Sequence, residues 1–185
     1  MKIAHLLVLC SVAATVFAAP QKEVASTYQK WLNEDVTYII TPAERVAFAK
    51  LSTDNQRKKF IDEFWLRRDP TPDTLENEFK DEHYRRIAYA NEHFGVQVPG
   101  WKTDRGRIYV VFGPPDEIED HSAGEKYDRP QEQGGGTTSA FPFFAWTYRN
   151  LEGIGTNVKI EFVDRAGSGE FHLIIDPNHP LGNGN

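Results

Sequence analysis

Apolar residues in the first half of the chain recur at intervals of three and four, the spacing of a helix that buries one face. Residues 21–33, 54–69 and 74–94 show this spacing. The apolar positions of the three predicted helices are Val24, Tyr28, Trp31 and Leu32; Phe60, Ile61, Phe64 and Trp65; and Leu75, Phe79, His83, Ile87 and Phe94. We therefore predict that the first half is helical and that each helix presents one apolar face to a core.

Capping residues indicate where these helices begin and end. The run Thr41-Pro42-Ala43-Glu44 combines a capping Thr, a Pro at the first helical position and a Glu that can reach back to the cap, and it predicts a further short helix that runs to about Leu51. Thr53 and Gln56 form a second capping pair. Pro70 cannot continue the helix that precedes it, and Gly95 is predicted to cap the end of the long helix.

The apolar spacing changes from about four to two after residue 106, which is typical of strands with one buried face. The predicted strands are residues 107–112, 143–149, 158–162 and 171–175, with a hairpin turn at 165–169 between the last two. The charged and Gly-rich residues 117–139 are predicted to form one long, mobile loop.

These patterns predict an α+β fold, in which N-terminal helices pack on one face of a C-terminal antiparallel sheet. We expect a single domain over residues 19–176, since no linker separates the two halves. Residues 177–185 are polar and are predicted to be a flexible tail.

Residues 1–18 have the composition of a secretory signal peptide. Lys2 precedes an apolar run over residues 3–17, and small residues lie before a predicted cleavage site after Ala18. Cleavage at Cys10 would leave too short an apolar region, so we do not expect a lipid anchor there. The mature chain would then contain no cysteine, and we expect an exported protein, periplasmic or secreted, without disulfides.

Charge and composition argue against several classes of partner. The formal net charge is −6, and Lys and Arg are not clustered as phosphate-backbone binding requires, so nucleic acid is not an expected partner. The mature chain has no apolar run of roughly 20 residues, so we expect no membrane span in it. No stretch has the ligand spacing of a zinc hydrolase or a calcium loop, and we expect no cofactor.

Several blocks of residues resemble those of a known family. They are Gly100-Trp101-Lys102-Thr103-Asp104, Arg105-Gly106-Arg107 and Gly113-Pro114-Pro115-Asp116-Glu117, together with residues 64–72 and 85–92. On these blocks the chain resembles the bacterial GWxTD-domain family over about residues 35–121. The resemblance implies a bacterial exported domain, and it carries over no catalytic residue.

The C-terminal half is also similar to small outer-membrane-assembly lipoproteins, in which two helices precede an antiparallel sheet. The similar residues are Gly113-Pro114-Pro115, Trp146-Thr147-Tyr148 and residues 158–164. This chain lacks the lipidated cysteine of those proteins and has a longer loop. The similarity therefore bears on fold and on a role in interaction, and not on identity.

The motif residues Trp101, Thr103 and Asp104 are candidates for a ligand site, because an indole offers a flat face and a carboxylate accepts hydrogen bonds. The structural alternative is that Trp101 fills a junction between a long helix and a first strand, while Thr103 or Asp104 caps backbone amides. Asp116, in the turn that follows, is a further candidate. No residue is assigned a catalytic or metal-binding role.

Two arginines are candidates for binding an anionic ligand. Arg68 and Arg105 lie in the blocks that resemble the family, and Arg68 with Asp104 is the pair to check for convergence. The structural alternative is that each arginine forms an ion pair with a nearby acid.

Three functions remain open at this point. The first is a non-enzymatic protein-interaction module with an envelope or secreted partner, which predicts an exposed apolar patch or an unpaired sheet edge. The second is an envelope hydrolase or metal-dependent enzyme with Asp104, Asp116 and His121 in one pocket. The third is a binder of a small ligand or glycan through Trp101 and the aromatic stripe of Phe144, Trp146 and Tyr148. The oligomeric state is left open.

Overall fold

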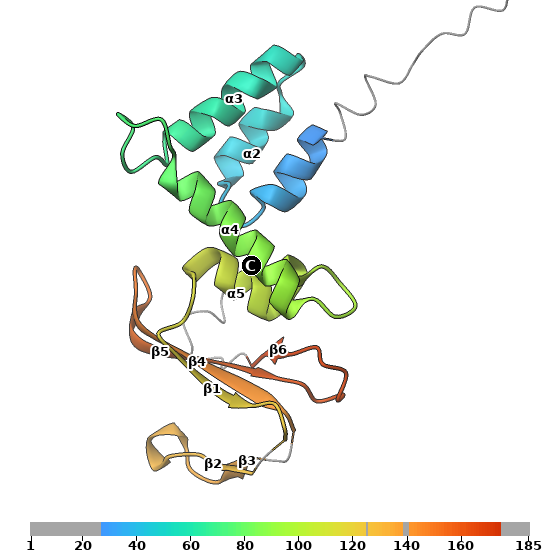
Figure 1. The fold of residues 1–185 in the computed structure, drawn as a ribbon, viewed down its shortest axis with the longest axis vertical. Coiled ribbons are helices and arrows are strands. Elements are labelled where there is room, and N and C mark those ends of the chain that lie inside the picture. The colour runs from blue at the N-terminus through green and yellow to red at the C-terminus, as the bar shows by residue number, and fades with distance from the viewer. Residues whose placement is uncertain (1–26, 125, 139–140, 175–185) are drawn as a thin grey trace, which may run out of the picture.

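The computed structural model describes residues 27–124, 126–138 and 141–174. Helices form the N-terminal part, and strands form the C-terminal part (Figure 1). Helix α4 (Glu78–Phe94) leaves the N-terminal helices and, with α5 (Asp104–Phe112), lies over one face of the sheet (Figure 1). This arrangement confirms the predicted α+β fold. The predicted signal peptide, Val24 and the predicted tail lie outside the described residues.

Three helices form the N-terminal part of the described chain before α4. They are η1 (Trp31–Asp35), which continues a helical turn at residues 27–30, α2 (Pro42–Ala49) and α3 (Asp54–Leu66). Two of them, α2 and α3, begin where their capping residues predicted. Thr41 and Glu44 cap each other's backbone amides at the start of α2, and Thr53 and Gln56 do the same for α3. The buried side chains of this part are Tyr28, Trp31, Leu32, Val36, Ile40, Phe48, Phe64 and Trp65.

Helix α4 begins later than its apolar pattern predicted. Asn77 caps its first turn by accepting a hydrogen bond from the Lys80 amide, so Leu75 lies before the helix and is fully exposed. At the other end, Gly95 occupies the C-cap with a φ of −76°, which is not the left-handed conformation of the predicted glycine cap. The predicted start of α4 was therefore wrong, whereas the helix itself and Gly95 as its C-cap are confirmed.

The strand predicted at residues 107–112 is wrong, because these residues belong to helix α5. Ile108 and Val110 are both buried, which produced the alternating pattern. The helix is sandwiched between α4 on one side and the sheet on the other (Figure 1). A helix that is buried on two sides has apolar residues all round, and its sequence then loses the spacing of three and four.

The sheet has four antiparallel strands in the order β1 (Glu117–His121), β4 (Phe143–Leu151), β5 (Gly155–Val163) and β6 (His172–Leu173). The predicted strands at 143–149 and 158–162 and the hairpin after them are confirmed. The long loop predicted at 117–139 is wrong in part, since it contains β1. It also contains a separate ribbon of β2 (Tyr127–Asp128) and β3 (Thr137–Thr138), with η3 (Gln131–Gln133) between them.

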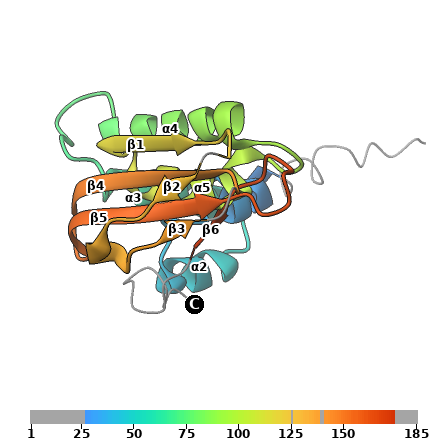
Figure 2. The ribbon, with the colours of Figure 1, turned by 90° about the horizontal axis from the view of Figure 1, so that it is seen from below.

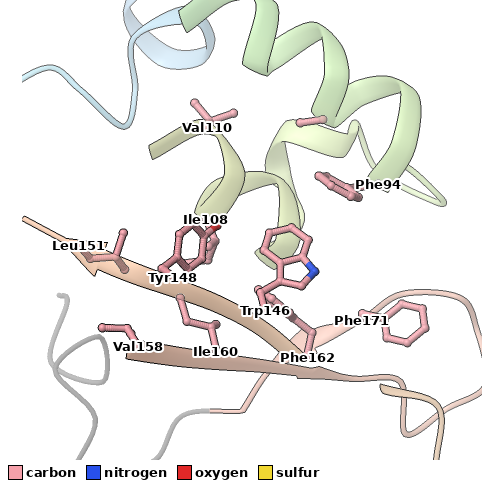
Figure 3. Close-up of a cluster of buried hydrophobic side chains, with 11 residues drawn as sticks. Phe94, Ile108, Val110, Trp146, Tyr148, Leu151, Val158, Ile160, Phe162 and Phe171 are labelled. Atoms are coloured by element: carbon pink, nitrogen blue, oxygen red, sulfur yellow. The ribbon is translucent and has the colours of Figure 1, made fainter. Parts of the chain in front are cut away.

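The main core lies between α4, α5 and the sheet. Figure 3 shows Trp146 and Tyr148 of β4 pointing from the sheet toward α5, where Ile108 lies beside Tyr148 and Val110 lies on the side of the helix away from the sheet. The exposed fraction of Trp146 is 2%. Among the described residues, no helix has both the length and the apolar character needed to cross a membrane.

Candidate functional site

The motif glycines allow three pieces of backbone to meet at one point. Gly100 lies in the short helix η2 (Gly100–Lys102), and a Cβ there would lie 1.8 Å from the carbonyl oxygen of Ala90 in α4. A Cβ on Gly106 would lie 1.8 Å from the carbonyl oxygen of Gly100. Since real atoms cannot approach so closely, any side chain at either position would force α4, η2 and α5 apart.

Trp101 ties this junction to the N-terminal helices. Its amide donates to the Asn91 side chain at 3.2 Å, and its carbonyl accepts from the Tyr38 hydroxyl at 3.1 Å. Its ring lies edge-on to Tyr38 with centroids 5.9 Å apart, and it is half-buried against the main core. These contacts support the structural alternative for Trp101, with the correction that the junction joins two helices and not a helix to a strand.

Thr103 and Asp104 fix the first turn of α5 and the last strand. The buried Thr103 hydroxyl donates to the Gly100 carbonyl at 2.8 Å and accepts from the Gly106 amide at 3.0 Å. The Asp104 carboxylate accepts from the backbone amide of Leu173 in β6 at 2.9 Å. It also lies 3.5 Å from the Arg107 guanidinium. Both side chains therefore serve as backbone caps, as the structural alternative proposed.

Arg105 follows these residues and makes a different kind of contact. Its guanidinium carbon lies over three phenyl rings, 5.1 Å from the centroid of Phe94, 4.8 Å from that of Phe144 and 4.4 Å from that of Phe171. Burial lowers its pKa, and the charge of Asp120 acts in the opposite direction. No hydrogen bond or ion pair joins this guanidinium to another described residue. Arg105 is thus a half-buried cation of the motif whose donors form no hydrogen bond within the described fold.

Arg68 lies in the N-terminal helical part, and its guanidinium forms its hydrogen bonds with residues of that part. Its guanidinium donates to both carboxylate oxygens of Glu44, at 3.0 and 2.8 Å, and to the carbonyls of Phe64 and Ile39. Hydrogen bonding to Arg68 lowers the pKa of Glu44 to about 2. No hydrogen bond or ion pair joins Arg68 to Asp104, so the pair that the sequence suggested does not form among the described side chains.

Asp116 and His121 lie at opposite ends of the first strand. The Asp116 carboxylate accepts from the backbone amide of Arg149 at 2.7 Å and from its guanidinium at 2.9 Å. The His121 ring stacks on Phe143 with centroids 4.4 Å apart. His121 lies five residue steps after Asp116 along an extended chain, which corresponds to roughly 16 Å. Together with Asp104 they do not form one pocket, and among the described residues no group of three His, Cys, Asp or Glu side chains could hold a metal ion.

The aromatic stripe of β4 is mostly core. Trp146 and Tyr148 are buried, and the Tyr148 hydroxyl donates to the Gly113 carbonyl at 3.0 Å. Phe144 is half-buried, with one face against Arg105. A glycan platform made of the whole stripe is therefore not present on the described surface.

A hollow of about 360 Å³ lies beside β5, and it was not predicted from the sequence. Its apolar wall includes Phe141, Phe143 and Val163, and an ion pair of 3.0 Å between Arg129 and Glu161 lies beside them. These residues come from separate segments, so no local pattern in the sequence could have predicted the hollow.

The outer edge of β1 is a second feature that sequence reasoning missed. Figure 2 shows β1 at one side of the sheet, where it pairs only with β4 among the described strands. The Thr147 carbonyl accepts from Asp116, so Thr147 faces β1, and its partner Glu117 faces β4 in turn. Backbone groups alternate along a strand, so the amides and carbonyls of Ile118 and Asp120 point outward.

Comparison with known proteins gives one result. The model of a family described as the GWxTD domain matches residues 17–151. No curated protein and no solved structure matches the chain.

Proposed function

The chain belongs to the GWxTD-domain family, and from that premise we propose that it is an exported, non-enzymatic protein-interaction module of the cell envelope. Its partner adds an extended segment to the outer edge of β1. The observation that carries this proposal is the outward-facing backbone of Ile118 and Asp120 beside an isoleucine side chain that is 54% exposed. Unpaired strand edges are a common docking mode, since backbone hydrogen bonds supply affinity and alternate side chains supply specificity.

Export is supported by the signal-peptide composition of residues 1–18. Cleavage after Ala18 would give a mature chain that begins at Ala19. The mass of the protein isolated from an envelope or extracellular fraction tests this step, and an intact N-terminus in that fraction would contradict it.

The charge of the edge indicates which segment fits. Glu117, Glu119 and Asp120 give β1 an acidic character, and Glu119 already pairs with Lys159 at 2.6 Å. Like charges placed directly opposite each other destabilise a strand pair, so a second copy of β1 is a poor partner. A segment with Lys or Arg opposite Glu117 and an apolar residue opposite Ile118 would complement both faces.

The orientation of the backbone gives a specific test. We expect partner binding to slow hydrogen exchange at the amides of Ile118 and Asp120, because these point outward. Exchange at Glu119 should change little, because its amide already faces β4. A synthetic basic strand peptide with alternating Lys and Val can serve as the probe with the mature chain. Equal protection of all three amides, or protection of none, would contradict docking at this edge.

Charge reversal provides the matched control. Glu117→Lys should weaken binding of the basic peptide about tenfold or more at low salt, since it places like charges opposite each other. Glu152→Lys makes the same change in the exposed turn between β4 and β5 and should leave binding within about twofold. Peptide titration of both variants by fluorescence anisotropy measures the difference.

A further inference from the structure

Arg105 has features of a binding residue that the edge of β1 does not explain. We propose that its guanidinium binds a carboxylate group of a ligand at the end of the main core. This site lies near Asp120 of β1, but it uses the Arg105 side chain and not the outward-facing backbone of the β1 edge, so each proposal can fail without the other.

Three phenyl rings hold the guanidinium in a fixed place. Phe94 comes from the end of α4, Phe144 from the start of β4, and Phe171 from the residue before β6. Figure 3 shows Phe94 in the helix layer and Phe171 in the sheet layer at the same end of the core. The neighbouring residue Asp104 binds β6 through the Leu173 amide, which fixes the start of α5 beside Phe171. The cation is therefore positioned before any ligand arrives.

The rings leave the donors of Arg105 without acceptors. A phenyl face attracts a cation but offers no carboxylate or carbonyl oxygen to the five guanidinium N–H groups. Each of the other half-buried arginines of the described chain has at least one oxygen as a hydrogen-bond or ion-pair partner. These are Arg45, Arg57, Arg68, Arg86, Arg107 and Arg129.

The Arg105 nitrogens are not among the fully buried polar atoms without a partner in the described chain, so they reach the surface, where a ligand can accept their hydrogen bonds. The planar guanidinium matches the two oxygens of a carboxylate, which it can bind through two parallel hydrogen bonds. The charge around Arg105 also favours a singly charged ligand. Asp120 is close enough to act on it electrostatically, so a phosphate dianion would meet one cation and one acid.

Titration with simple carboxylates tests this site in the whole chain. We expect sodium benzoate and sodium acetate to shift the ¹H–¹⁵N signal of the Arg105 Nε group saturably, with Kd values on the order of millimolar. Arg105→Gln should weaken benzoate binding about tenfold, since it removes charge-assisted hydrogen bonds. Arg107→Gln is the matched control two residues away on the same helix. Arg107 already pairs with Asp104, so this variant should bind benzoate as the wild type does.

Two further measurements test whether the planar guanidinium of Arg105, and not its charge alone, binds the carboxylate. Arg105→Lys keeps the charge and loses the planar pair of donors. We therefore expect it to weaken benzoate binding about threefold, less than Arg105→Gln does. Shift mapping on the wild type decides the question if the variants do not fold, because signals of Arg105 and its three rings must move together. The proposal is overturned if benzoate moves other arginines equally, if no signal saturates, or if phosphate binds more tightly than either carboxylate.

Discussion

Arg68 in the helical half and Arg105 beside the sheet both contact phenyl rings, yet their donors are used differently. Each guanidinium lies over phenyl rings, at 3.7 Å from Phe64 for Arg68 and at 4.4 Å from Phe171 for Arg105. In the helical half, Glu44 and two backbone carbonyls accept the hydrogen bonds of Arg68. In the sheet half, no described residue accepts a hydrogen bond from Arg105.

This difference shows that contact between a cation and an aromatic ring does not by itself identify a binding residue. A ring fixes where the guanidinium lies, whereas acceptors determine whether its donors are still available. Arg68 is therefore expected to stabilise the fold, and Arg105 is expected to contribute little to stability and more to binding.

Arg68→Ala should have the largest effect on stability. It leaves the Glu44 carboxylate, whose side chain is 17% exposed, without its main partner, and we expect a loss of about 4 kcal/mol in the free energy of unfolding. Urea denaturation measures this loss. Arg67→Ala is the control, because Arg67 contacts the same carboxylate from a 49% exposed position and should cost less than about 1 kcal/mol. Similar losses of unfolding free energy in the two variants would contradict the role of Arg68 as the main partner of Glu44.

Lowering the pH should gradually remove the ion pair between Glu44 and Arg68, because the Glu44 carboxylate becomes protonated. Hydrogen bonding to Arg68 holds the pKa of Glu44 at about 2 in the folded chain, below the usual value of 4.5. The stabilisation is thus complete above about pH 5, and it is lost as the pH falls toward 2. The stability difference between the wild type and Glu44→Gln should shrink by about 3 kcal/mol over this range. A difference that stays constant from pH 7 to pH 2 would show that the carboxylate is not paired.

Arg105→Met should have the smallest effect. Methionine keeps an unbranched apolar side chain among the three rings and removes a charge that is costly to bury. We expect the free energy of unfolding to change by less than about 1 kcal/mol, because the lost cation–ring attraction is offset by the desolvation that is no longer needed. Thermal unfolding of the variant measures this. If Arg105→Met lowers the free energy of unfolding as much as Arg68→Ala does, Arg105 stabilises the fold and the proposed difference between the two arginines is wrong.

The parts of the fold that depend on neighbouring residues could be predicted from the sequence. Thr41 with Glu44 and Thr53 with Gln56 form capping pairs within one helical turn, so their effect does not depend on the rest of the chain. The alternation of β5 could also be predicted from the sequence. Val158, Ile160 and Phe162 are buried on one face of the sheet, and the residues between them are more exposed on the other.

Helix α5 shows where this reasoning fails. Burial of Ile108 and Val110 on different sides of one helix imitates the alternation of a strand, and only the positions of α4 and the sheet reveal the cause. The motif was correctly assigned to a family on its residues. Its structural role was misjudged, because Gly100 and Gly106 allow helices to approach and do not turn a helix into a strand.

The sequence by itself determined the family, the α+β class and the starts of α2 and α3, because these depend on motifs and on hydrogen bonds within a few residues. Tertiary structure alone decided that residues 104–112 form a helix and which arginine keeps its donors available. The acceptor of Arg68 lies 24 positions away in the chain, and the rings around Arg105 come from α4, β4 and the residue before β6. Contacts between such distant segments are set by how the layers pack, and no local pattern encodes them.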